Sequence, residues 1–137
     1  MKVILDTNVV MSGIFFSGPP YQIMDAWRCG QLDLVLSKEI YQEYHRVAKI
    51  LNKKYPVVNI HSILELIVHK AELISSIPFD TQVCEDPDDD MFLECASSAN
   101  VKMIVSGDKH LLDVSGFQGI EVIKPADFAI KYLKKNA

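Results

Sequence analysis

Cysteine is scarce in this chain. Its 137 residues include only Cys29, Cys84 and Cys95, and no two of these form a CxxC pair. An odd number of cysteines without ligand spacing argues against both a disulfide framework and a zinc site. Three reduced thiols suit the cytoplasm, which is therefore the expected location.

Long apolar runs are missing as well. The apolar stretch from Met1 to Phe16 is interrupted by Asp6 and has only Lys2 as a basic residue. No small-x-small cleavage pattern follows it, so it does not have the features of a signal peptide. No other run approaches the length of a membrane-spanning helix. We therefore expect a cytoplasmic protein with no membrane partner.

Positive charge is in deficit overall. The 14 Lys and Arg residues stand against 18 Asp and Glu residues, which gives a formal net charge of −4. A nonspecific nucleic-acid binder is normally basic. The acids are concentrated, however, because segment 80–94 holds seven of them and no Lys or Arg, while the rest of the chain is net positive. An acidic pit with basic flanks suits a metal-dependent phosphodiesterase; a solvated acidic loop is the simpler alternative.

Composition and pattern indicate one globular α/β domain over residues 1–137. The hydrophobic fraction is 49% and the charged fraction 23%, as in ordinary globular proteins. Strand-like runs alternate with helix-like runs, which predicts a three-layer α/β/α sandwich with a central parallel sheet of four or five strands. Strands are expected at 2–6, 32–36, 103–106 and 121–123, with a short extended piece near 82–84. Helices are expected over about 21–29, from Ser37 to about 51, from 59 or 61 onward, over 90–100 and over 126–134.

Two acids follow predicted strands. Asp6 closes the apolar run Val3–Leu5, and Asp108 comes two residues after the run that ends at Ser106. Parallel strands deliver such residues at the carboxyl edge of a sheet, where open α/β folds bind ligands. Converging carboxylates repel one another and lose solvation unless a cation neutralises them.

Two further acids lie on predicted helices. Glu43 follows the predicted N-cap Ser37 by six residues, and Asp90 opens a helix on which Glu94 shares its face. Glu43 is equally compatible with the polar edge of an amphipathic helix. Asp86–Asp89 have the composition of a helix cap.

Other families with similar local patterns fit less well. The spacing of Asp86, Asp88 and Asp90 is that of an EF-hand loop, but Met91 stands at the sixth position and Ser97 at the twelfth. A phosphatase of the haloacid-dehalogenase type would need an acid where Asn8 stands. A receiver domain would need an acidic neighbour beside Asp6. His45, His61 and His69 show no ligand spacing and are expected on the surface or in helix packing.

The chemistry of the acids points to Mg²⁺ or Mn²⁺, one or two per site. These ions take oxygen ligands and keep several waters, and two of them about 3.5–4 Å apart can clamp the attacking and leaving oxygens of a phosphodiester. Asp6 and Asp108 are the first choices as ligands, Asp90 is the third, and Glu43 would bind a second ion or orient the attacking water. Supporting roles are expected for Asn8, Ser106 and Glu94. Contacts to the phosphate backbone of a nucleic acid are expected from Lys109, His110, Arg46, Lys53 and Lys54.

Taken together, these motifs resemble the PIN-domain nucleases, in particular small VapC-like toxins. The resemblance covers nearly the whole chain and rests on Leu5–Asn8, on Ser37 with Glu43, and on Asp90-Met-Phe-Leu-Glu-Cys-Ala, with Asp108 eighteen residues after Asp90. Ser106 stands where Thr is commoner. Three consecutive acids leave Asp89 and Asp90 as alternatives for the third position, and the spacing to Asp108 favours Asp90.

The resemblance implies a metal-dependent endoribonuclease that cleaves single-stranded RNA to 5′-phosphate and 3′-hydroxyl ends. It further implies a homodimer and a toxin held inactive by a small antitoxin protein. RNA in preference to DNA rests on the resemblance alone. Two alternatives remain open: a solitary RNA-processing nuclease, and a non-catalytic module that binds nucleic acid or protein and uses the acids as a structural metal site.

Overall fold

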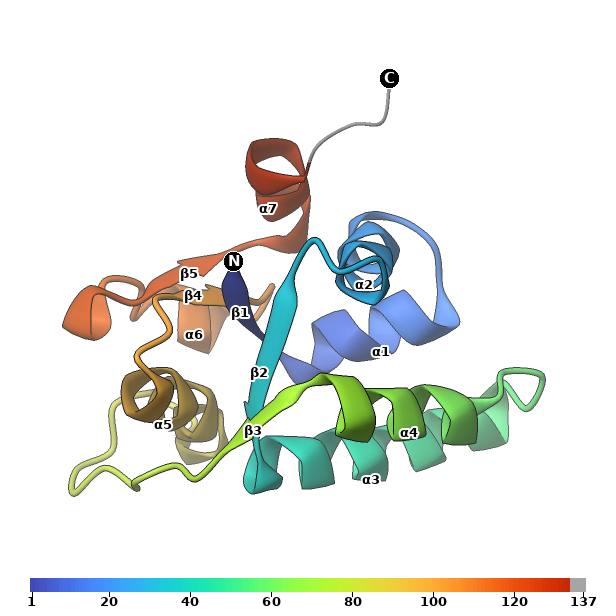
Figure 1. The fold of residues 1–137 in the computed structure, drawn as a ribbon. Helices are drawn as coiled ribbons and strands as arrows, with labels where there is room; N and C mark the ends of the chain where they lie inside the picture. The colour runs from blue at the N-terminus through green and yellow to red at the C-terminus, as the bar shows by residue number, and fades with distance from the viewer. Residues whose placement is uncertain (134–137) are drawn as a thin grey trace.

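The computed structural model describes residues 1–133 and contains, over that range, five parallel strands in one sheet (Figure 1). The strands are β1 (Lys2–Leu5), β2 (Asp33–Ser37), β3 (Glu72–Ile74), β4 (Met103–Val105) and β5 (Glu121–Ile123). Their order across the sheet is β3-β2-β1-β4-β5. The parallel α/β sheet predicted from the sequence is thereby confirmed.

The central strands β1 and β4 are direct neighbours. Their register pairs Ile4 with Ile104 and Leu5 with Val105, so the carboxyl ends of both strands lie side by side. The strand order reverses here, because β2 and β3 extend from β1 in one direction and β4 and β5 in the other. Open α/β sheets bind ligands at such a switch point. The residues that follow β1 and β4 therefore stand where a site is expected.

Helices cover both faces of the sheet. On one face α5 (Asp90–Ala99) packs against β1 to β4. The opposite side carries three helices, α1 (Thr7–Phe15), α2 (Pro19–Arg28) and α7 (Pro125–Tyr132) (Figure 1). Two longer helices lie side by side, α3 (Lys38–Lys54) and α4 (Ile60–Lys70) (Figure 1). The short elements of the described chain are η1 (Pro87–Asp89), α6 (Lys109–Leu112) and η2 (Phe117–Gly119).

The two long helices begin at side-chain caps. The Ser37 hydroxyl accepts a hydrogen bond from the Ile40 amide at 3.3 Å, which confirms Ser37 as the N-cap of α3. The Asn59 side chain accepts one from the Ser62 amide at 3.2 Å and caps α4. The C-terminal helix α7 ends at Tyr132, and the predicted end at residue 134 lies outside the described residues.

Several elements differ from the sequence prediction. The extended piece expected at 82–84 is not a strand, because the Val83 and Cys84 amides are bound by a carboxylate instead of a neighbouring strand. The fifth strand is β3, whose three residues at the sheet edge are largely exposed and therefore lack the apolar pattern of a buried strand. The helices predicted from the sequence also did not include α1, whose Thr7 and Asn8 had the composition of a turn.

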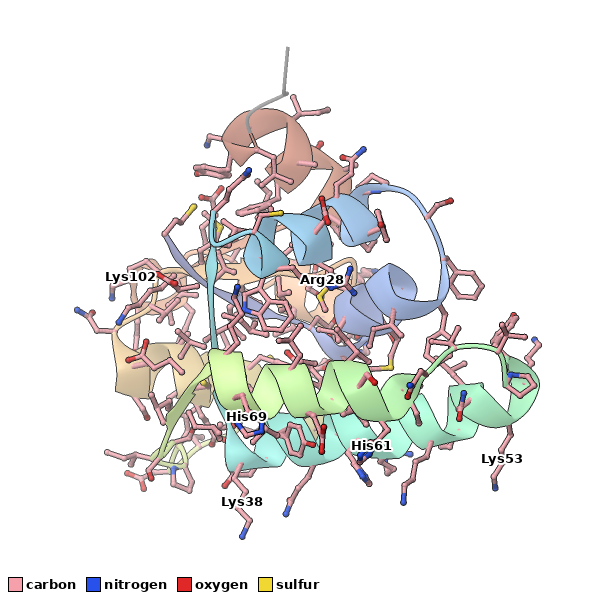
Figure 2. The ribbon with its side chains drawn as sticks, turned by 45° about the vertical axis from the view of Figure 1, so that its right-hand side comes forward. Arg28, Lys38, Lys53, His61, His69 and Lys102 are labelled. Atoms are coloured by element: carbon pink, nitrogen blue, oxygen red, sulfur yellow. The ribbon has the colours of Figure 1, made fainter. Side chains whose placement is uncertain are left out.

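The apolar core fills the space between the layers. Its largest fully buried side chains include Trp27, Tyr44, Phe92 and Phe128, each from a different helix. Lysines such as Lys38 and Lys53 point outward from α3 (Figure 2). None of the helices over residues 1–133 combines the length and the apolar character that a membrane crossing requires.

Candidate metal centre

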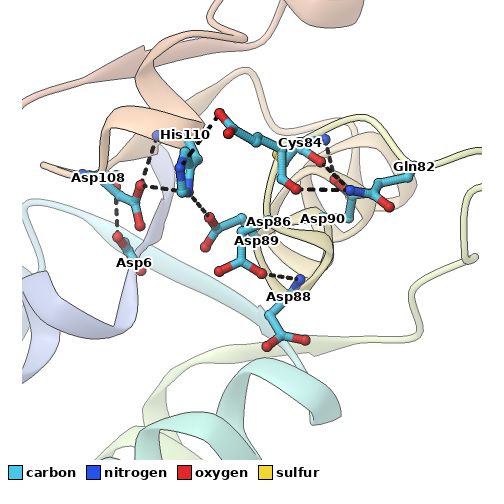
Figure 3. Close-up of polar contacts among 11 residues, drawn as sticks. Asp6, Gln82, Cys84, Asp86, Asp88, Asp89, Asp90, Asp108 and His110 are labelled. Atoms are coloured by element: carbon cyan, nitrogen blue, oxygen red, sulfur yellow. Dashed lines mark hydrogen bonds and ion pairs between the residues drawn. The ribbon is translucent and has the colours of Figure 1, made fainter.

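Asp6 and Asp108 are joined through a buried serine at the carboxyl ends of β1 and β4. The Ser106 hydroxyl donates to Asp6 Oδ2 at 2.6 Å and accepts from the Asp108 amide at 2.9 Å. Asp108 Oδ1 in turn accepts from the His110 amide at 2.8 Å and caps α6 (Figure 3). Burial raises the pKa of Asp6, the Ser106 hydrogen bond opposes that rise, and the nearby Asp108 charge adds to it. The strand ends thus hold two acids close together at a cost in electrostatic energy.

Asp89 brings a third carboxylate to the same place from η1. Its side chain is only 12% exposed, and Oδ2 has no hydrogen-bond partner among the described residues. Burial, together with the negative charges of Asp108 and Asp6, raises the pKa of Asp89 to about 6. A buried carboxylate oxygen without a donor is costly. A cation is the partner that such an oxygen lacks.

Asp90, the next residue, has different surroundings. Its two carboxylate oxygens accept hydrogen bonds from the Val83 amide at 2.9 Å and the Cys84 amide at 2.7 Å. These bonds hold the 82–85 loop against the start of α5 (Figure 3). The structure therefore groups Asp89 with Asp6 and Asp108, while the oxygens of Asp90 are bound to backbone amides.

Glu43 reaches the site from α3. It is half-buried, and its two oxygens accept hydrogen bonds from Arg46 Nη2 at 2.7 Å and Nε at 3.2 Å. The neighbouring Tyr44 is fully buried and its hydroxyl donates to the Leu5 carbonyl, which immediately precedes Asp6. This bond fixes α3 against the end of β1, and so sets the position of Glu43 relative to Asp6.

The acids line a cavity of about 180 Å³. Its oxygen-bearing wall consists of Asp6, Thr7, Asn8, Glu43, Asp86, Asp88, Asp89 and Asp108. Thr7 Oγ1 is buried and, like Asp89 Oδ2, lacks a partner within residues 1–133. A wall of carboxylates with unpartnered oxygens matches the donor set of a hard divalent cation. A larger cavity of about 670 Å³ adjoins it and shares Glu43, Asp88 and Met91.

Comparison with protein families gives a match to the PIN domain over residues 2–110. This chain belongs to the PIN-domain family. The matched region runs from β1 into α6 and contains every acid of the cavity. PIN domains are generally nucleases that use divalent metal ions, so the fold is of a nuclease type. A comparison with curated proteins gave no match.

Some of the other residues predicted for this PIN-domain site line the two cavities, and others lie farther from the acids. Asn8 is exposed on α1 and lines the cavity. Glu94 accepts a hydrogen bond from the Phe79 amide at 2.7 Å and lines the larger cavity. Lys109 is exposed beside Asp108. Lys53 and Lys54 stand at the far end of α3, roughly 15 Å along the helix from Glu43.

Sequence reasoning missed a metal-binding arrangement around His110. Asp86, Asp89 and His110 each offer a ligand atom, and these atoms lie within 4.8 Å of one another. Asp86 caps η1 through a 3.0 Å bond from the Asp88 amide, whereas the sequence predicted that segment 86–89 would cap the helix from Asp90. The available signal was the position of His110 two residues after a helix-capping acid, in the first turn of α6. A side chain there leans back toward the helix start, and so toward the acids.

Proposed function

We propose that this PIN-domain protein is a divalent-metal-dependent endoribonuclease that hydrolyses phosphodiester bonds of single-stranded RNA. The observation that carries the proposal is the convergence of Asp6, Asp89 and Asp108 around one cavity, with Asp89 Oδ2 left without a partner. Membership of a generally nucleolytic family supports it.

The residues around the cavity fit Mg²⁺ or Mn²⁺, one or two per site. Asp6, Asp89 and Asp108 would hold the cation, with Glu43 at the edge of the cavity for a second one. Asp90 was the third acid favoured by sequence spacing, but we propose Asp89 for that role because the oxygens of Asp90 are bound by two amides. A bound cation supplies positive charge for the developing phosphorane oxygens and lowers the pKa of a water molecule.

Other side chains around the cavity would orient the metal ligands, the attacking water and the phosphate. Ser106 fixes one oxygen of Asp6, whose side chain lines the cavity. Glu43, held by Arg46, is placed to orient the attacking water and accept its proton. Asn8 can hold a phosphate oxygen through its amide group, because it is exposed at the cavity wall.

Basic side chains near the acids would bind the RNA backbone. Lys109 is exposed directly after the cavity acid Asp108. Arg46 is exposed one helical turn after the cavity acid Glu43. Lys53 and Lys54 extend the positive charge along α3, so a strand of several nucleotides could follow that helix. His110, which the sequence also predicted as a backbone contact, has both ring nitrogens turned toward carboxylates instead.

The biological setting that we propose is the toxin of a cytoplasmic toxin–antitoxin pair, active as a homodimer. A small antitoxin with a basic side chain would complement the acidic cavity. The reading frame beside the gene tests this directly. A neighbour that encodes a small protein with a DNA-binding start and a charged tail supports the pair, whereas its absence favours a solitary RNA-processing nuclease.

Cleavage of a circular single-stranded RNA tests the activity. A circular substrate has no ends, so only an endonuclease can open it. Cleavage is expected with Mg²⁺ or Mn²⁺ and not with EDTA, and the linear product should carry a 5′-phosphate and a 3′-hydroxyl. A circular DNA of the same sequence shows whether the enzyme discriminates between the sugars.

Asp6→Asn, Asp89→Asn and Asp108→Asn should each lower the cleavage rate by more than the roughly 10- to 100-fold that follows the loss of an outer-shell partner. Asp25→Asn is the matched control, because Asp25 is exposed on α2 and does not line the cavity. If a folded triple variant of the cavity acids cut RNA at the parent rate, the site would lie elsewhere. If the folded, metal-loaded parent cut no RNA, the non-catalytic binding module would be favoured.

A further inference from the structure

The imidazole of His110 stands among carboxylates without being hydrogen-bonded to them. Its Nδ1 lies 3.6 Å from Asp89 Oδ2 and 3.7 Å from Asp108 Oδ1. Both separations exceed the range of an N–H···O hydrogen bond. Figure 3 shows the ring turned into the group of acids, with Asp108 on one side and Asp89 on the other. Neither carboxylate oxygen is therefore close enough to accept a well-formed hydrogen bond from Nδ1.

These separations suit donors that share one ion. Ligand atoms held at about 2.0–2.2 Å from a cation, at angles between octahedral and tetrahedral, lie roughly 2.8–3.6 Å from one another. The gap between His110 Nδ1 and Asp89 Oδ2 falls at the upper end of that range. Asp86 offers a third ligand atom within 4.8 Å of the other two, so its half-buried side chain would have to move closer to share the ion.

An independent feature also points to a ligand. The side chain of Asp89 is 12% exposed, and its Oδ2, the oxygen that faces His110, is buried and has no hydrogen-bond partner in the described chain. A simple acidic surface cluster would leave its oxygens in water. Here the site offers an anionic oxygen that water does not reach and that no donor satisfies.

The other nitrogen of the ring has a suitable second partner. His110 Nε2 lies 3.7 Å from Glu85 Oε2, on the side of the ring away from Asp89. Histidines that bind metals through one nitrogen usually present the other N–H to a carboxylate, which fixes the tautomer and raises the basicity of the ligand. Small side-chain rotations would bring the exposed Glu85 within hydrogen-bond distance.

We propose that His110 Nδ1, Asp86 and Asp89 form a mixed nitrogen–oxygen site that binds a first-row transition-metal dication in preference to Mg²⁺. Mg²⁺ takes oxygen ligands and dehydrates reluctantly, whereas imidazole nitrogen suits first-row transition metals such as Fe²⁺, Ni²⁺ and Zn²⁺. The inference rests on the proposed function because Asp89 belongs to both ligand sets. It adds to that function a nitrogen ligand and, with it, a preference between the two candidate metals.

Mn²⁺ is the most demanding probe, because it binds most weakly in the transition-metal series. Pulsed electron paramagnetic resonance on the Mn²⁺-loaded protein reports nitrogen bound to the ion, and ¹⁵N-histidine labelling identifies histidine as its source. The variants are His110→Gln and the control His69→Gln, which removes an exposed histidine at the end of α4 (Figure 2). Calorimetric titrations with Mn²⁺ and Mg²⁺ complete the set.

The parent and His69→Gln should show a nitrogen coupling that His110→Gln lacks. In His110→Gln the Mn²⁺ affinity should fall about 10-fold or more, and the Mg²⁺ affinity should change by less than about twofold. Should His110→Gln fail to fold, the ¹⁵N-labelled parent still tests the proposal, because substoichiometric Mn²⁺ should broaden the His110 ring signals before those of His69.

Other outcomes separate this inference from the nuclease. Mn²⁺ bound to the parent without any nitrogen coupling would overturn the mixed site. The proposed function would survive that result if metal-dependent RNA cleavage remained and Asp108→Asn abolished it. Failure of both metals to bind the folded parent would overturn both proposals.

Discussion

Asp89 and Asp90 are neighbours in the chain with opposite surroundings. Asp89 ends η1 and turns a buried, unpartnered oxygen toward Asp6, Asp108 and His110. Asp90 begins α5, and the Val83 and Cys84 amides satisfy its carboxylate. The negative charge of Asp90 is stabilised by two amides, whereas the negative charge of Asp89 is repelled by the neighbouring acids. Substitution by Asn should therefore change stability in opposite directions.

Asp90→Asn should lower the free energy of unfolding by about 1.5–3 kcal/mol, the usual worth of a hydrogen bond to a charged group. An asparagine can accept from only one of the two amides and turns its own N–H₂ toward the other. Asp89→Asn should raise the free energy of unfolding of the metal-free protein at pH 7, because it removes one of several converging charges. Urea denaturation in EDTA measures both.

Asp80→Asn is the control for this pair, because Asp80 is exposed in the loop before Val83 and makes none of these contacts. Its midpoint should match that of the parent. Equal destabilisation by Asp89→Asn and Asp90→Asn would mean that both carboxylates are bound in the same way, against the contrast drawn from the structure.

The difference between these two residues also shows where sequence reasoning stops. Spacing to Asp108 favoured Asp90. Spacing does not give the direction of a side chain, which depends here on the 82–85 loop whose amides bind Asp90. Asp6 and Asp108 were easier to find, because parallel strands that end in an acid leave little freedom in where that acid lies.

At the level of elements, the long and strongly patterned segments were predictable and the short or crowded ones were not. The buried strands β1 and β4 and the capped helices α3 and α4 carried clear signals in periodicity and in Ser37 and Asn59. The edge strand β3 and helix α1 carried weak ones. Helix α1 begins at Thr7 without a side-chain cap and contains a glycine, so packing against its neighbours decides its stability more than propensity does.

Gly13 is the point of closest approach between α1 and α2. A Cβ atom at this position would lie 2.8 Å from the Pro20 carbonyl oxygen and in collision with Met24 Cγ. Alanine favours a helix over glycine by about 0.5–1 kcal/mol, but overpacking of this kind costs about 1–3 kcal/mol. The steric term should win, partly because Pro20 contributes rigid backbone.

Gly13→Ala should therefore lower the free energy of unfolding by about 0.5–2 kcal/mol. Unfolding followed by the fluorescence of Trp27, which is buried on α2, measures the change. Ser12→Ala makes the matched control, since it changes the adjacent helical position at a partly buried site. An unchanged or raised stability in Gly13→Ala would show that α1 and α2 can separate without loss.

For the molecule as a whole, the cavity concentrates charge that the fold alone does not neutralise. Asp6 lies more than eighty residues before Asp89 and Asp108 in the sequence, and the reversal of strand order between β1 and β4 brings Asp6 and Asp108 together. The overall charge of −4 adds to their repulsion. Without a bound cation, the folded structure therefore opposes the ionisation of Asp6 and Asp89.

This opposition has a definite dependence on pH. The pKa of Asp89 is raised from 3.8 to about 6 and that of Asp6 is also raised, so the folded protein binds more protons than the unfolded chain between about pH 4 and pH 6. Stability of the metal-free protein should fall as pH rises through this window. Urea midpoints measured in EDTA between pH 4 and pH 7 should show this slope, and Asp89→Asn should flatten it. An unchanged slope in Asp89→Asn would assign the pH dependence to other groups. In the parent protein, Mn²⁺ at pH 7 should restore the lost stability, because it binds only the folded state.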